Sequence, residues 1–242
     1  MLDQSMVLPL VEEAFGRWAM VVPQEDWLQR TGVTHEPTLE FLRTIGLPVQ
    51  NPILSAVQAL TRPPETLADV LSQPESGLEP DPDRLGRYGD LVWIAYGAGD
   101  EAVFLDPRTG IVYGFVNYDT EPFVYNSSVS HMVYFAAYFE IHSKIDGLWL
   151  DDLVGADDPE AAFDAAEAIG RHFADTDPAA CQPPEDNLWQ AVTEDGFAAG
   201  IYSEWAWQRQ SVEYFAEHGI DPTILRPRRP LAKHVINPWS ER

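Results

Sequence analysis

Three runs of apolar and aromatic residues occupy the middle of the chain, and turn-forming residues separate them. They cover residues 91–97, 102–116 and 121–128. Runs of this length that are rich in β-branched and aromatic side chains predict consecutive antiparallel strands. Within the second run, Pro107 is followed three residues later by Gly110, which predicts a tight hairpin. Asp106 can accept hydrogen bonds from turn amides and Gly110 can adopt positive φ at no steric cost, so we assign Asp106 to turn geometry rather than to catalysis.

A helix is predicted directly after the third run. Asn126, Ser127 and Ser128 offer side-chain oxygens to the free amides of a first helical turn. Apolar residues then recur at spacings of three and four, at Met132, Val133, Phe135, Ala136 and Phe139. This spacing predicts a helix with one buried face.

Shorter patterns precede the predicted sheet. We expect N-terminal elements at residues 9–19 (helix), 23–29 (helix), 53–58 (strand) and 64–71 (helix). Pro37 is placed for the first turn of a further helix, and Gly46 ends that helix. The polar stretch at residues 72–86 contains several Pro and Gly residues, so we interpret it as a surface excursion rather than a domain boundary.

Helical patterns return after the sheet, at residues 158–173, from residue 185 onward and at residues 205–218. The fold class predicted is therefore α+β, a mostly antiparallel sheet meander flanked by N- and C-terminal helices. A chain of 242 residues with 45% hydrophobic residues is long enough for one large domain. We expect this domain to span residues 1–203, with a C-terminal helix and a basic Pro/Arg tail, residues 204–242, packed on the same domain.

The formal net charge of −24 is the strongest signal in the composition. Nucleic acid repels such a surface, because affinity for phosphates comes from Lys and Arg. A basic protein complements the surface and is steered toward it. Acidity for solubility alone is the ordinary alternative, and the composition leaves it open.

The acidity is concentrated in residues 140–195, where fifteen acids stand against Lys144 and Arg171, a net charge of −13. As candidate contacts with a basic partner we take Asp146, Asp151, Asp152, Asp157, Asp158 and Glu160. The helix dipole alone also favours acids at a helix N-terminus, which explains Asp157 and Asp158 equally well. These runs lack the alternate-residue oxygen spacing and the mid-loop Gly of a helix–loop–helix calcium site.

The sequence contains no arrangement typical of catalysis or of cofactor binding, such as a phosphate-binding Gly-rich loop or a zinc-binding His pair. The six His residues occur in unrelated contexts. His131 and His142 share a predicted helix but are eleven residues apart, too far for two ligands one turn apart. A pairing of Ser127 or Ser128 with His131 suggests a nucleophile and a base, but cap serines have their oxygens committed to helix amides. We therefore expect no catalytic residue, no metal and no cofactor.

Two further features predict a cytoplasmic location. The single Cys181 cannot form an internal disulfide and has no neighbouring base, so we expect an unreactive thiol in a reducing compartment. The N-terminal residues lack a basic segment, and acids interrupt their apolar runs. We therefore expect neither a signal peptide nor a membrane span.

Three features, taken in order along the chain, resemble one known family. Residues 41–48 end a helix in a Gly-Leu-Pro turn, residues 106–110 read Asp-Pro-Arg-Thr-Gly between two strands, and Asn126 opens an Asn-Ser-Ser entry into a helix. Across residues 10–200, their order and spacing resemble the SUKH-4 type of bacterial immunity protein, which is part of the SUKH group of Smi1/Knr4-like domains.

The resemblance implies a cytoplasmic antidote, encoded beside a secreted polymorphic toxin, that binds the toxin and blocks it. Many such toxins are nucleases or nucleic-acid deaminases, so the implied partner is a cognate basic toxin domain, with no nucleic acid and no membrane. The alternative from the same group is a Smi1/Knr4-like regulatory adaptor or scaffolding protein. A neighbouring gene for a large secreted protein would favour the first function. A third hypothesis, a hydrolase with an unrecognised site, requires a perturbed acid–base pair in a deep pocket.

Overall fold

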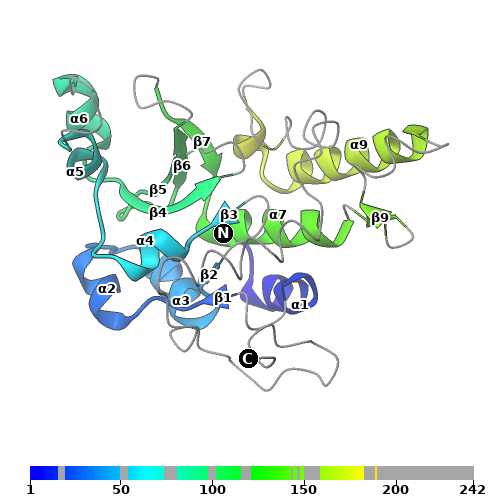
Figure 1. Ribbon diagram of the computed structural model, residues 1–242, viewed down its shortest axis with the longest axis horizontal. Coiled ribbons are helices and arrows are strands. Elements are labelled where there is room, and N and C mark those ends of the chain that lie inside the picture. The colour runs from blue at the N-terminus through cyan, green and yellow to red at the C-terminus, as the bar shows by residue number, and fades with distance from the viewer. Residues whose placement is uncertain are drawn as a thin grey trace, which may run out of the picture.

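A five-stranded antiparallel sheet lies at the centre of the computed structural model (Figure 1). Its strands follow one another in chain order: β3 (Leu54–Ser55), β4 (Val92–Gly97), β5 (Ala102–Leu105), β6 (Val112–Phe115) and β7 (Phe123–Asn126). Each neighbouring pair is antiparallel. The predicted α+β class and the predicted meander are therefore confirmed.

The structure describes residues 1–15, 20–49, 54–73, 81–97, 102–115, 121–142, 144–145, 148–149, 159–182 and 189. For residues 57, 144–145, 148–149 and 159–163 it describes the backbone alone. Two small antiparallel sheets pair β1 (Met20–Val21) with β2 (Leu47–Pro48), and β8 (Lys144–Ile145) with β9 (Leu148–Trp149). Within these described ranges, no helix combines the length and the apolar character that a membrane span requires.

Both faces of the central sheet are covered, as β5 illustrates. Val103 and Leu105 belong to the large apolar cluster that includes α7 (Val129–His142), whereas Ala102 and Phe104 belong to a second cluster with α5 (Leu67–Leu71) and α6 (Pro82–Tyr88). Figure 1 shows α7 on one side of the sheet and α5 and α6 on the other. A strand that is buried on both faces needs apolar side chains at successive positions, which explains why the central runs read as almost continuously hydrophobic.

The helix α7 is buried nearly all round. It packs against α1 (Gln4–Ala14), α3 (Glu36–Thr44) and α9 (Pro159–Thr176), and nine of its fourteen residues are buried. The five apolar positions predicted to be buried are all buried, but the prediction of a single buried face was too narrow. Since each fully buried Phe, Met or Val contributes about 1.5–3 kcal/mol, this helix is a main anchor of the core.

The hairpin between β5 and β6 has the predicted geometry. The Oδ1 atom of Asp106 accepts hydrogen bonds from the N–H groups of Arg108 (2.8 Å) and Thr109 (3.3 Å), and Gly110 has a φ of 77°. Asp106 is therefore a turn residue, as predicted.

The tip of this hairpin also contacts the start of α3, which the sequence did not reveal. The carbonyl of Pro107 accepts hydrogen bonds from the N–H groups of Thr34 (2.8 Å) and His35 (3.3 Å). A Cβ atom on Gly110 would lie 2.4 Å from Nδ1 of His35 and 2.6 Å from Oγ1 of Thr38. Gly110 is therefore required both by its φ and by the closeness of α3.

The N-terminal helix differs from its prediction. α1 begins at Gln4 rather than at Pro9, because the carboxylate of Asp3 accepts a hydrogen bond from the N–H of Ser5 (2.8 Å) and caps the helix. Pro9 stands inside the helix, on an exposed position. Taking Pro9 as the first helical position was therefore wrong. α2 (Glu25–Arg30) and α3 lie where they were predicted, and Gly46, with a φ of 81°, ends α3.

Two further predictions need correction. Of the described residues 54–58 in the strand predicted at residues 53–58, only Leu54–Ser55 is in a strand, and α4 (Val57–Thr61) begins inside that range. The stretch at residues 72–86 includes the start of α6, which Asp81 caps by accepting a hydrogen bond from the N–H of Asp83 (3.0 Å). α6 contains no buried residue, so it lies at the surface as predicted, but the pattern did not reveal that it is helical.

The C-terminal part is described as far as residue 182, and at residue 189. α9 runs to Thr176 and is followed by a short 3-10 helix, η3 (Pro178–Cys181). Trp189, at 1% exposure, is buried as its predicted helical position required. The helices predicted from residue 185 and at residues 205–218, and the tail at residues 204–242, lie outside the described residues and stay predictions.

Candidate functional site

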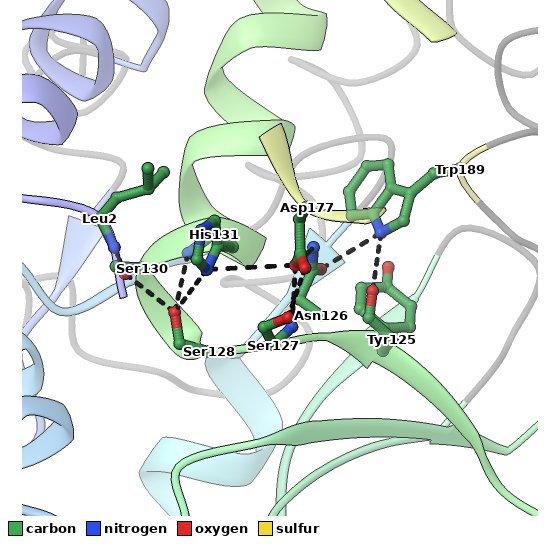
Figure 2. A network of polar contacts seen from close by, with 9 residues as sticks. All are labelled: Leu2, Tyr125, Asn126, Ser127, Ser128, Ser130, His131, Asp177 and Trp189. Carbon is green, nitrogen blue, oxygen red and sulfur yellow. Dashed lines mark hydrogen bonds and ion pairs between the residues drawn. The ribbon is translucent and has the colours of Figure 1, made fainter. Parts of the chain in front are cut away.

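Polar side chains gather where β7 passes into α7 (Figure 2). Asn126 ends β7, Ser127 and Ser128 follow it, and His131 lies in the first turn of α7. Asp177 reaches the same point from the connection between α9 and η3. We call this group, together with Ser130, the junction network.

Asp177 is the acceptor at the centre of the network. Its carboxylate accepts hydrogen bonds from the backbone N–H of Ser127 (2.8 Å) and from Nδ2 of Asn126 (3.2 Å), and the hydroxyl of Ser127 donates a third. The residue is only 2% exposed. A buried carboxylate is tolerated when hydrogen bonds replace its hydration, and these donors fulfil that requirement.

Of the three residues predicted to cap α7, Ser128 is the N-cap, whereas the side chains of Asn126 and Ser127 donate hydrogen bonds to Asp177 instead. Its hydroxyl accepts a hydrogen bond from the backbone N–H of His131 (3.3 Å) and lies 2.9 Å from the Nδ1 atom of the same residue. The hydroxyl of Ser130 is 2.9 Å from that of Ser128 and accepts a hydrogen bond from the N–H of Leu2 (3.0 Å). The network therefore connects the N-terminus of the chain to the start of α7.

The electrostatic environment keeps His131 neutral. Burial lowers the pKa of its imidazole, the nearby Asp177 raises it, and the N-terminal ammonium group lowers it. The effect of burial is the largest, so the pKa lies below that of an ordinary histidine. At neutral pH the imidazole is therefore uncharged and available for hydrogen bonding within the network.

Ser128, His131 and Asp177 are the residue types of a hydrolytic triad, but their geometry is different. In a triad, one imidazole nitrogen faces the nucleophile and the other faces the carboxylate. Here the single atom Nδ1 of His131 is 2.9 Å from Ser128 Oγ and 4.0 Å from Asp177 Oδ2. Ser128 is 2% exposed and already caps the helix. This arrangement is suited to joining helices and a strand, and not to activating a hydroxyl.

Trp189 closes the network on the side of β7. Its indole Nε1 donates to the carbonyl of Tyr125 (3.0 Å) and to Oδ1 of Asn126 (3.2 Å). Its ring contacts those of Phe135 and Phe173 at centroid distances of 5.1 and 5.3 Å. Trp189 thereby contacts both the sheet and α7.

A second group of rings lies between α7 and α9. The ring of Tyr138 contacts those of His142 and His172, each at a centroid distance of 4.0 Å, and the Tyr134 hydroxyl is 2.9 Å from Nε2 of His172. Burial lowers the pKa of both histidines, and the charge of His142 lowers that of His172 further. The description of the six His residues as unrelated was therefore wrong for this pair, because the fold brings α7 and α9 together.

The described part of the chain contains one thiol, that of Cys181. Burial raises the pKa of the Cys181 thiol to about 11, so the thiol is protonated at neutral pH and unreactive, in keeping with its predicted role. Within the ranges that the structure describes, no group of three or more His, Cys, Asp or Glu side chains could hold a metal ion.

Comparison with known proteins identifies the family. A family model, SUKH-4 immunity protein, matches residues 9–195 of the 242. The chain belongs to the SUKH-4 immunity protein family. No curated protein and no solved structure matches it. The matched segment runs from α1 to beyond Trp189, so it includes the whole sheet, α7 and the junction network of this SUKH-4 protein.

The structure does not test the acidic residues that were predicted to contact a partner. Asp146, Asp151, Asp152, Asp157 and Asp158 lie outside the described residues, and Glu160 lies in the first turn of α9 with only its backbone described. These six assignments stay predictions.

One acid of the same segment needs a different interpretation. Residues 140–195 were treated as a single acidic surface, but Asp177 is buried in the junction network and cannot contact a partner. Asp164, Glu167 and Asp175 of α9 are exposed. Glu167 forms an ion pair with Arg171 (2.7 Å), an exposed i,i+4 pair of small energetic value.

Sequence reasoning missed Asp177 as a network residue. Its hydrogen-bond partner Asn126 lies 51 residues earlier in the chain. No local pattern marks such a pairing, and only the expected cap at Asn126, Ser127 and Ser128 indicated that polar side chains meet here.

Proposed function

We propose that this SUKH-4 protein binds a cognate polymorphic toxin in the bacterial cytoplasm and neutralises it by covering its active site. Membership of an immunity protein family supports the role. The net charge of −24 supports the mode of binding and is the observation that carries it. An acidic surface attracts a basic partner and raises the rate of association.

The toxin that best fits this charge is a nuclease or a nucleic-acid deaminase. Enzymes that act on nucleic acid hold its phosphates with Lys and Arg, so their active-site grooves are basic. An acidic protein that occupies such a groove excludes the substrate. The same acidity disfavours binding of this chain to nucleic acid itself.

We place the contact surface in the segment that holds most of the acids, residues 140–195. The proposed contacts are Asp146, Asp151, Asp152, Asp157, Asp158 and Glu160. Exposed Asp164 and Asp175 on α9 support the choice, because they extend acidity along the same segment. Ion pairs at the rim of such an interface act mainly on association rate and on salt dependence.

Neutralisation in this proposal requires no catalysis by the SUKH-4 protein. The hydroxyl of Ser127 donates a hydrogen bond to Asp177, and that of Ser128 caps α7. The groups most similar to catalytic residues are therefore already used to hold the fold. Binding and occlusion are therefore the mechanism that we propose.

Co-expression tests the proposal. The toxin domain encoded by a neighbouring gene should kill bacteria alone and should not kill them when this chain is present. The purified pair should associate at about 10⁸ M⁻¹s⁻¹ at low salt and several-fold more slowly at high salt, as expected for electrostatic steering. Absence of both rescue and binding for every neighbouring gene product would contradict the proposal.

A further inference from the structure

A hollow of about 300 Å³ lies between α2 and the segment that follows α4. It is at the small end of the range for ligand pockets, large enough for one bulky side chain and its neighbours. The lining residues on which the argument depends are Pro23, Trp27, Arg30, Leu60, Arg62 and Pro64. All of them are described, and none belongs to the junction network or to the proposed acidic contacts.

The floor of the hollow is apolar and rigid. Trp27 is 5% exposed, and its indole Nε1 donates a hydrogen bond to the carbonyl of Ala59 (3.1 Å), which fixes the ring. Leu60 is 9% exposed, and the rings of Pro23 and Pro64 restrict the backbone at these positions. Little conformational entropy is lost when such a site is filled, so its contacts contribute more fully to affinity.

The charged residues that line the hollow are mostly positive, opposite in sign to the net charge of the chain. Arg30 and Arg62 carry two positive charges there, and Asp26 is the one carboxylate among the lining residues. Asp26 is paired with Arg30 at 2.6 Å. In the part of the chain that the structure describes, Arg62 has neither an ion pair nor a hydrogen bond. A guanidinium beside an aromatic floor is thus left for a partner, in a chain whose net charge is −24.

We propose that this hollow binds an acidic segment of a partner protein, which inserts one bulky apolar side chain over Trp27 and places a neighbouring carboxylate on Arg62. The apolar floor would contact the inserted apolar side chain. The unpaired guanidinium would bind the carboxylate, since Arg binds carboxylates through two parallel hydrogen bonds. The inference goes beyond the proposed function, because it requires neither a toxin nor the acidic surface.

Three short peptides test the proposal on the intact chain. They are acetylated and amidated pentapeptides in which a central Leu is flanked by two Glu, two Gln or two Lys residues. Binding is followed in a proton–nitrogen spectrum through the indole N–H signal of Trp27, which is assigned among the eight Trp signals by its loss in Trp27→Phe. The Glu peptide should shift this signal in a saturable way with a Kd of about 1 mM or tighter, the Gln peptide should bind more weakly, and the Lys peptide should not bind.

Two variants and one control assign the binding to the hollow. Arg62→Gln should weaken the binding of the Glu peptide about two- to five-fold, the range expected for an exposed ion pair. Thr61→Tyr, which adds a large ring at an exposed lining residue without changing charge, should abolish binding. Arg108→Gln removes the same charge from the exposed hairpin tip and should leave affinity unchanged. Thermal unfolding confirms that each variant is folded.

Each alternative outcome overturns the proposal. Absence of a saturable shift with the Glu peptide means that the hollow is not a binding site. If the Lys peptide binds as tightly as the Glu peptide, Arg62 does not bind a carboxylate of the peptide. Unchanged affinity in both Arg62→Gln and Thr61→Tyr places the peptide elsewhere. None of these results depends on toxin neutralisation, so failure here and failure of the proposed function are distinguishable.

Discussion

The junction network and the hollow beside Trp27 show opposite uses of polar side chains. In the network, Ser127, Ser128 and Asp177 bond to other groups of the chain and are largely buried. In the hollow, Arg62 is exposed and has no partner in the described part of the chain. The network contains residue types that suggest catalysis, yet its groups are already paired. The hollow contains ordinary residue types, yet one of its charges is free.

The pairing of a side chain, more than its type, indicates what it can do. A buried hydrogen-bonded group contributes to stability and becomes costly when its partner is removed. An exposed unpaired charge contributes little to stability and is free to act in binding. Changes in the network should therefore reduce stability, whereas changes at the surface should reduce binding.

The largest effect is expected for Asp177→Ala. The change leaves the N–H and hydroxyl of Ser127 and the amide of Asn126 without their buried acceptor. At about 1–3 kcal/mol for each unsatisfied group, partly relieved by water, we expect a loss of roughly 3–5 kcal/mol in the free energy of unfolding. Chemical denaturation at fixed pH measures it.

Asp175→Ala is the matched control for this change, because it removes an exposed acid two residues away. It should alter stability by less than about 0.5 kcal/mol. If both variants were equally stable, the network would not be the structural junction described above, and the contrast with the hollow would fail.

The next largest effect is expected at the hairpin tip. Gly110→Val forces a β-branched residue toward positive φ and places its Cβ against His35 and Thr38. We expect a cost of about 2–4 kcal/mol in the free energy of unfolding, made of backbone strain and steric collision. Gly32 has a φ of 67°, and a Cβ atom added there would have nothing within 4 Å, so Gly32→Val reports the strain alone. Equal costs at the two positions would show that the contact with α3 contributes nothing.

A smaller effect concerns pH. Because the pKa of His131 is lower in the folded chain than in the unfolded one, the unfolded chain binds more protons as pH falls. Stability should therefore decrease below about pH 6.5, by at most about 1.4 kcal/mol per pH unit for each such histidine, and level off below the folded pKa. His131→Asn should reduce this slope, and His142 and His172, whose pKa values are also lowered, contribute to it in the same direction. An unchanged slope would mean that the pKa of His131 is the same in the folded and unfolded chains.

The smallest effect on stability is expected at the acidic surface. Replacing Asp151, Asp152, Asp157 and Asp158 by Asn should slow association with a basic toxin at low salt and leave the fold intact. If Asp157 and Asp158 serve only the helix dipole, stability falls by about 0.3–1 kcal/mol per charge and the association rate is unchanged. Stopped-flow association at two salt concentrations separates the two cases. An unchanged rate would direct attention to the acids between Glu65 and Glu101.

The sequence allowed prediction of elements whose cause is local. The four strands between residues 92 and 126, the turn at Asp106 and Gly110, and the cap at Ser128 depend on residues close to one another in the chain, and each was found as expected. The start of α1 was missed because the capping residue Asp3 was overlooked in favour of Pro9.

Features that depend on distant segments could not be predicted in the same way. Asp177 meets Asn126 across 51 residues, and Tyr138 contacts His172 only because α9 packs on α7. The hollow beside Trp27 forms between α2 and the segment after α4, each of which looks ordinary alone. Periodicity predicts which side chains are buried, but it does not specify which of them meet.

We propose that this SUKH-4 protein acts by occupying its toxin and not by modifying it. Titration of toxin activity with increasing amounts of the purified chain, read at several incubation times, distinguishes the two. We expect activity to fall linearly to an end point at a fixed ratio of the two proteins, with the same end point at every time. A continuing loss of toxin activity with time, at amounts of the chain well below that ratio, would show turnover and would contradict the account.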